Sequence, residues 1–141
     1  MLRGGGAFAF TFWADRQHNS AWRIIVDAVA ACGRTDVPMP AGNDAYATPD
    51  NFTRLVAAAG FDGAVRCDDI ARDWVLPPDA DLVSIFETGT VRMAALLRGQ
   101  GEALAGVRRK AAEDMRHYLR DGRIVLPTRA WVVVAKVEEA A

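Results

Sequence analysis

The first residues whose types and spacing could do chemistry are glycines near the N-terminus. Gly4, Gly6 and Ala9 satisfy the G-x-G-x-x-(G/A) pattern of dinucleotide-binding loops. That chemistry needs a strand before the glycines and a helix after them, because the pyrophosphate binds at the helix N-terminus. Only three residues precede Gly4, and a phenylalanine-rich strand sequence follows. We therefore interpret the cluster as a tight turn into a strand.

The histidines and paired acids form no metal-binding pattern. Asp68 and Asp69 are adjacent, so on a strand they point to opposite faces and cannot share a metal or a proton. His117 lies four residues after Glu113, the spacing of a surface pair on a helix. His18 follows the first predicted strand, at the end where open α/β sheets bind ligands. A plain loop position is the favoured interpretation, and a functional role, with His18 as the one nearby candidate base, is the alternative.

Composition narrows the class of protein. The chain has 141 residues, of which 51% are hydrophobic and 25% charged, and its formal net charge is -1. This balance gives no reason to expect a nucleic-acid or anionic-membrane partner. Cys32 and Cys67 form no CxxC pair, so we expect two buried thiols, with one disulfide as the alternative. Without an apolar run of about 20 residues or a signal peptide, we expect a cytoplasmic protein.

Hydrophobic spacing predicts an α/β chain. We expect strands over 7–13, 63–75 and 129–137, and helices over 20–32, 48–60, 81–98 and 102–120. The strand 7–13 is uncharged on both faces, which is typical of a strand covered on both sides. The strand 63–75 is charged, which is typical of a sheet edge.

The two long predicted helices could form a ligand pocket. An apolar stripe on them could line a hydrophobic cavity, or it could simply be core. Arg92 lies among the apolar residues and could orient a ligand there. The residues of the stripe are Phe86, Met93, Leu97, Met115 and Tyr118. The basic triplet 108–110 shares its helix with acidic residues, so we expect it to be a solvated face.

These segments together resemble class I S-adenosylmethionine-dependent methyltransferases. Residues 2–14 resemble the turn and fifth strand of that family, and the similarity continues through 46–50, 58–61 and 87–92 to the closing strand near 131–136. The resemblance implies a partial Rossmann-like sheet of strands five, six and seven, with an antiparallel strand seven between five and six. It further implies one domain over 1–141 with an inserted two-helix cap at about 79–121.

The same resemblance places the cofactor site outside this chain. In that family the cofactor is held mainly by a glycine loop after the first strand and an acidic residue after the second. The chain begins just before the fifth strand, so we expect no S-adenosylmethionine binding by the chain alone, and whether it is an enzyme stays open. The resemblance carries over only acceptor-side residues, namely Trp13, His18, Trp22, Phe86, Arg92, Met93 and Tyr118.

The missing strands also imply a partner. In the family the fifth strand pairs with the fourth, so residues 7–13 would form an uncharged edge that is prone to association. We expect this edge to pair with a second copy in a homodimer, or with a polypeptide that supplies the N-terminal half. A non-catalytic dimeric module that binds an apolar molecule between the cap helices is the alternative function.

Overall fold

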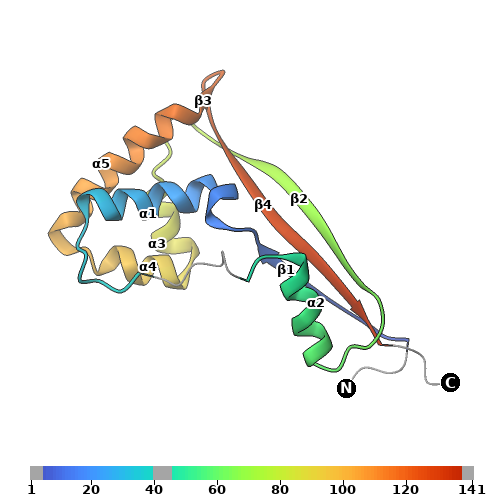
Figure 1. The fold of residues 1–141 in the computed structure, drawn as a ribbon. Helices are drawn as coiled ribbons and strands as arrows, with labels where there is room; N and C mark the ends of the chain where they lie inside the picture. Colours follow the sequence, from blue (N-terminus) through green and yellow to red (C-terminus); the bar gives the residue numbers. More distant parts are fainter. Residues whose placement is uncertain (1–4, 40–45, 138–141) are drawn as a thin grey trace. The chain divides into compact units, whose positions relative to one another are not determined.

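The computed structural model describes residues 5–39 and 46–137, and in this range the chain has an α/β fold with an antiparallel sheet (Figure 1). The strands are β1 (Ala7–Trp13), β2 (Val65–Leu76), β3 (Leu119–Arg120) and β4 (Arg123–Lys136). The helices are α1 (Ser20–Cys32), α2 (Pro49–Ala58), α3 (Leu82–Gly89), α4 (Val91–Arg98) and α5 (Leu104–Met115). Across these described stretches, no helix has both the length and the apolar character that a membrane span requires.

The chain divides into two compact units. The sheet unit comprises the described residues of 1–18, 42–72 and 129–141, and the helical unit comprises those of 19–41 and 73–128. Short 3-10 helices at Arg16–His18, Gly101–Ala103 and Arg116–Tyr118 join the longer elements.

Strand β4 is the central strand of the sheet. The order is β1-β4-β2, with β3 paired to the start of β4, and β1 runs antiparallel to β4 from the pair Ala7–Lys136 to the pair Trp13–Ala130. The closing strand therefore lies between the first two strands, as expected. Its expected start at residue 129 was wrong, because β4 begins at Arg123.

The start of β4 is set by a hairpin, at a point where the sequence predicted the end of a helix. Asp121 and Gly122 both have positive φ, at 47° and 73°, which is the conformation of a two-residue hairpin turn. This turn pairs Leu119 with Ile124. The helix expected to reach Arg120 consequently ends at Met115, and Tyr118 lies in a 3-10 turn.

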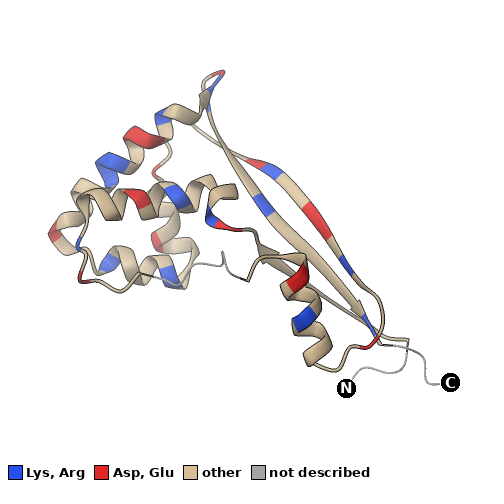
Figure 2. Cartoon of the chain, viewed as in Figure 1, with Lys and Arg blue, Asp and Glu red and all other residues tan. Residues whose placement is uncertain are grey.

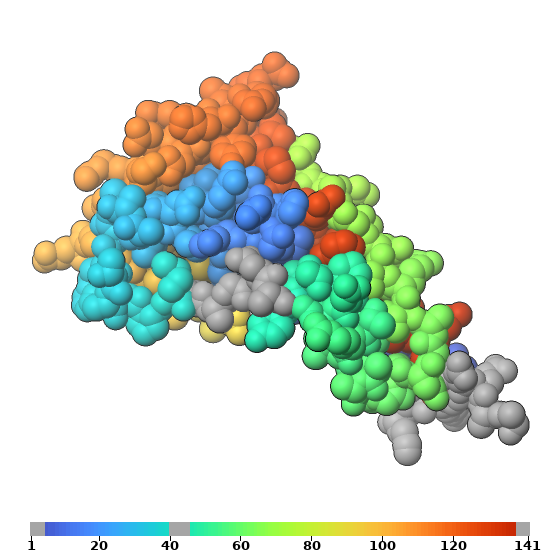
Figure 3. All heavy atoms as spheres, in the orientation of Figure 1, coloured from blue at the N-terminus to red at the C-terminus, as the bar shows by residue number. Residues whose placement is uncertain are grey.

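Within the sheet unit, one face of the sheet packs against α2. Phe8, Phe10 and Phe12 share this face by alternation. Phe52 of α2, only 1% exposed, packs on Phe10 and Phe12, while the ring of Phe8 meets that of Phe61 at 5.6 Å. The ring centroid of Phe52 lies 5.9 Å from that of Phe10, 5.5 Å from that of Phe12 and 6.3 Å from that of Trp131. In the space-filling view, atoms of α2 (green) form part of the visible surface of the sheet unit (Figure 3).

Local signals in the sequence explain where α2 begins and ends. The Thr48 side chain accepts a hydrogen bond from the N–H of Asn51, and Pro49 occupies the first turn. At the other end Gly60 has a φ of 89°, and the N–H of Phe61 donates to the carbonyl of Val56. These are the caps that the sequence predicts.

The opposite face of β1 is open, contrary to the expectation of a strand covered on both sides. Ala7, Ala9 and Thr11 are exposed, and Trp13 is 61% exposed. The physical reason is that α2 is the only α-helix among the described residues of the sheet unit. It can cover only one face.

The helical unit is built around a single apolar cluster. Its fully buried members come from α1, α3, α4, α5 and β4 and include Ile25, Leu82, Met93, Val107 and Leu126. The single helix expected from 81 to 98 is instead two helices, because Thr90 is extended, with φ -143° and ψ 136°. The expected two-helix cap over about 79–121 therefore contains three α-helices.

A buried amide holds α4 near the end of α1. The side chain of Gln100 is fully buried, its Nε2 donates to the carbonyl of Leu96 at 3.1 Å, and its Oε1 accepts from the N–H of Arg34 at 2.6 Å. A Cβ at Gly33 would lie 2.5 Å from this Oε1, so the close approach requires glycine there.

We predict that Phe52→Ala destabilises the protein by about 3–5 kcal/mol, because it removes a buried ring that contacts both β1 and β4. Leu55→Ala is the matched control, since Leu55 lies on the same helix and is 56% exposed. Its effect should stay within about 0.5 kcal/mol. Urea denaturation followed by circular dichroism measures both, and equal losses would show that Phe52 carries no special packing.

We also predict that Gln100→Ala lowers the free energy of unfolding by about 1–3 kcal/mol, because it removes both hydrogen bonds of a fully buried amide and leaves the N–H of Arg34 without its acceptor. Gln17→Ala, at an exposed position, is the control and should be close to neutral. If the two variants unfold at the same denaturant concentration, the buried amide is not a structural clamp.

Candidate functional site

The candidate site at the end of β1 is a turn that joins Asp15 to His18. One carboxylate oxygen of Asp15 lies 2.7 Å from Nδ1 of His18 and also accepts the backbone N–H of His18 at 3.1 Å. The backbone carbonyl of Asp15 accepts the same N–H at 3.2 Å. The short 3-10 helix Arg16–His18 supplies this geometry. The pair is therefore built by one turn of chain.

The contact with His18 sets the charge state of Asp15. Burial raises the pKa of the Asp15 carboxyl, but hydrogen bonds from the ring and the backbone N–H of His18 outweigh it, so the pKa is lowered overall. A carboxylate at Nδ1 favours the tautomer that carries its proton there. Nε2 of His18 can then accept a proton. The side chain of His18 is 46% exposed, so it is open to an incoming group.

The sequence predicts a candidate role for His18 but not for Asp15. The signal was present as an acidic residue three positions before the histidine in a loop, where one turn of 3-10 helix brings the two side chains together. Trp13, the other candidate in the sheet unit, is the exposed last residue of β1.

Four of the remaining candidates pack in the helical unit. Phe86 and Met93 belong to its buried cluster, and Trp22 and Tyr118 pack against that cluster. The rings of Trp22 and Phe86 meet edge-on at 6.4 Å. These contacts place the four residues in or against the core. A core role was the alternative to a pocket that the sequence left open. Arg92 is exposed on α4.

The hydroxyl of Tyr118 is engaged within the helical unit. It accepts a hydrogen bond from Nη2 of Arg23 at 2.5 Å, which joins the 3-10 turn after α5 to α1. The hydrogen bond from Arg23 therefore fixes the hydroxyl of Tyr118. The residue lies in a 3-10 turn and not in the helix that the sequence predicted.

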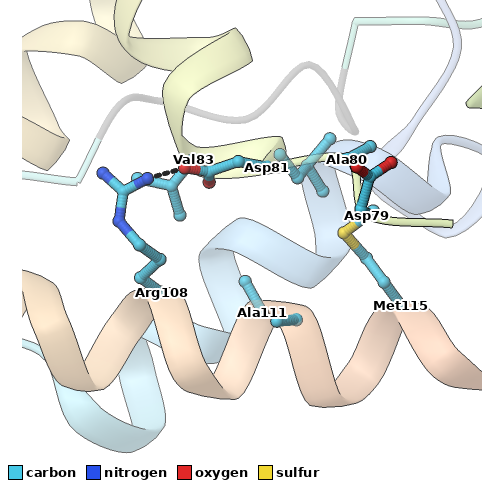
Figure 4. Close-up of a pocket in the computed structure, with 9 residues that line it drawn as sticks. Asp79, Ala80, Asp81, Val83, Arg108, Ala111 and Met115 are labelled. Carbon is cyan, nitrogen blue, oxygen red and sulfur yellow. Dashed lines mark ion pairs between the residues drawn. The ribbon is translucent and has the colours of Figure 1, made fainter. Parts of the chain in front are cut away.

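The helical unit contains a small pocket of about 170 Å³ near the start of α3 (Figure 4). Arg108 lines it and forms ion pairs with Asp81 and with Glu87, the latter at 3.2 Å, while its Nη1 donates to Oγ of Ser84 at 2.9 Å. The Arg108 side chain stays 38% exposed, which agrees with the expected solvated face, but it also bridges α5 to α3. Because its guanidinium already pairs with two carboxylates, Arg108 is not free to bind an anionic ligand in this pocket.

The described residues offer neither a metal-binding cluster nor an activated thiol. No group of three histidine, cysteine, aspartate or glutamate side chains there could hold a metal ion. Both cysteines are free, and Cys32 is exposed, which corrects the expectation that both are buried. Burial and the charge of Asp68 raise the pKa of the Cys67 thiol, so the reactive thiolate is disfavoured.

Comparison with known proteins adds no family. No protein-family model matches the chain, and no curated protein is significantly similar to it in sequence. Function is therefore inferred from the fold and from the residues described above.

We predict that His18→Gln raises the pKa of Asp15, because the variant weakens the ring contact that favours the carboxylate. Carboxyl ¹³C titration by NMR measures this shift, and His117→Gln is the control because its 3-10 turn is remote in sequence from Asp15.

Because the pKa of Asp15 is lowered in the folded protein, its ionised carboxylate stabilises the fold. This stabilisation is fully present above the unfolded pKa of about 3.9 and is lost as the pH falls through the lower folded value. Loss of His18 should therefore lower stability most above about pH 4, and the difference from wild type should shrink as the pH falls through the folded pKa of Asp15. An Asp15 titration that is the same in wild type and variant would contradict the pairing.

Proposed function

We propose that the chain is the acceptor-side segment of an S-adenosylmethionine-dependent methyltransferase-like protein and that it does not bind the cofactor or catalyse alone. The observation that carries this proposal is the sheet order β1-β4-β2, with β4 antiparallel in the centre. The resemblance implies this order for strands five, seven and six. The connection from β1 to β2 includes α2, and the connection from β2 to β4 carries α3, α4 and α5.

The residues near the N-terminus do not fit the cofactor. Gly5 has a φ of 75° and is followed by Gly6 and β1, while Gly4 lies outside the described residues. A nucleotide loop needs a helix N-terminus immediately after the glycines, and here a strand follows. The cofactor-binding part must then come from another segment or polypeptide, which would supply the activated methyl group.

The chain's own contribution would lie at the end of β1. Asp15 orients His18 so that Nε2 can accept a proton from an acceptor, and Trp13 offers an exposed apolar surface in the same unit. Methyl transfer mainly requires that the methyl acceptor is correctly positioned. A general base is needed only when the methyl acceptor must lose a proton.

A second candidate is a non-catalytic dimeric module. The observation in its favour is the uncharged edge of β1, which carries no second strand among the described residues. The suggested apolar ligand between the cap helices has less support, because Met93 and Leu97 are fully buried by neighbouring side chains.

Titration calorimetry of the purified chain with S-adenosylmethionine tests the proposed function. We expect no binding heat at micromolar cofactor, because no helix N-terminus follows the glycines. Adding a cofactor-binding half from a methyltransferase that lacks its own acceptor side should restore binding only in the mixture. Binding by the chain alone would overturn the proposal. Absence of binding in the mixture as well would favour the non-catalytic module.

A further inference from the structure

The outer edge of β1 carries a row of backbone groups that point away from the sheet. The N–H of Ala14 donates to the carbonyl of Arg129 at 3.0 Å, just beyond one end of the ladder. The N–H of Val137 donates to the carbonyl of Gly6 at 3.0 Å, just beyond the other end. Hydrogen-bonded pairs alternate along an antiparallel ladder. The even-numbered residues of β1 therefore bond to β4, and the outward groups belong to Ala7, Ala9, Thr11 and Trp13.

The two edges of the sheet differ in charge. The β2 edge carries Arg66, Asp68, Asp69, Arg72 and Asp73, whereas β1 has no charged residue from Ala7 to Trp13. Figure 2 shows the contrast as red and blue bands along β2 and an uncoloured β1. Charges on an edge strand discourage pairing with other chains. Strand β2 has this protection, and β1 lacks it.

We propose that β1 pairs antiparallel with β1 of a second copy of this chain, so that the two sheets become continuous across a two-fold axis at Phe10. This register places Ala7 opposite Trp13 of the partner subunit and Ala9 opposite Thr11 of the partner subunit. It pairs all seven residues of β1, and each outward-pointing residue meets another outward-pointing residue.

The side chains of β1 suit such self-pairing. Three of the residues whose backbone groups point outward, Ala7, Ala9 and Thr11, have small side chains. These side chains lie on the open face of the sheet and leave room for a neighbouring strand. On the other face Phe8 is 43% exposed, so a second copy would also cover apolar surface there. No like charges oppose each other across the axis, because the strand has none.

The purified chain tests this pairing directly. Sedimentation velocity from micromolar concentrations upward should show twice the 15.3 kDa chain mass. Thr11→Lys should reduce the mass to that of a monomer, because the exposed edge acquires a charge that faces the second copy. Ala71→Lys, an equally exposed substitution on the already charged strand β2, is the matched control and should leave the dimer intact.

Amide hydrogen exchange identifies the edge. In the wild-type dimer the N–H groups of Ala9 and Thr11 should be protected, and in Thr11→Lys that of Ala9 should exchange at least tenfold faster. The N–H of Phe10, which bonds to β4, should stay protected in both proteins and so reports that β1 remains folded. A wild-type monomer, or a dimer that Thr11→Lys does not weaken, would overturn the proposal.

The two proposals can fail separately. Calorimetry with the cofactor reports on the proposed function, whereas sedimentation and exchange report on the β1 edge. A monomer whose Ala9 amide becomes protected only when a cofactor-binding half is added would reject the homodimer and leave the methyltransferase proposal standing.

Discussion

The structure depends on β4 being paired on both sides. Its run from Trp131 to Ala135 is continuously apolar, and Val133 and Ala135 are fully buried. A strand of this composition is stable only inside a sheet. There, neighbouring strands form hydrogen bonds with its backbone groups, and packed helices bury its side chains. Because β4 takes the centre, β1 and β2 become the two edges. The aromatic contacts of Phe52 with Phe12 and Trp131 hold α2 over β1 and β4 together.

The two edges meet the same physical problem in different ways. Strand β2 carries charges of both signs, and Asp69 forms an ion pair with Arg129 of β4 at 2.7 Å, so its charges also hold it to its neighbour. Strand β1 has neither charge nor proline, and its second face is open as well. Natural sheets seldom leave such an edge without cover. The sequence of β1 is therefore better explained as an interface than as a surface, whichever chain provides the neighbouring strand.

Much of the fold could be predicted because its signals are local. The alternation of Phe8, Phe10 and Phe12 predicted β1, and the caps at Thr48 and Gly60 predicted α2. The break at Thr90 escaped prediction because the apolar spacing continues across it, so periodicity alone cannot separate two helices from one. The Asp121-Gly122 turn was read as a helix end, although the same dipeptide also favours a hairpin. For the site, the turn after β1 gave His18, but an apolar stripe reads the same whether it lines a pocket or fills a core, and Met93 fills the core.

The pairing of Asp15 with His18 bears on how a divided methyltransferase-like protein could work. Both side chains belong to one turn, and the contact between them uses groups three residues apart. Their geometry is set by local chain and does not wait for a cofactor-binding segment to arrive. A proton acceptor that is already oriented costs no further ordering when the sheet is completed. Under the proposed function, the position of the methyl donor would have to be set by another segment, because the donor's site requires a glycine loop followed by a helix. The uncharged edge of β1 is where such a segment would have to join, so a homodimer formed through the same edge would also keep the chain inactive until the dimer dissociates.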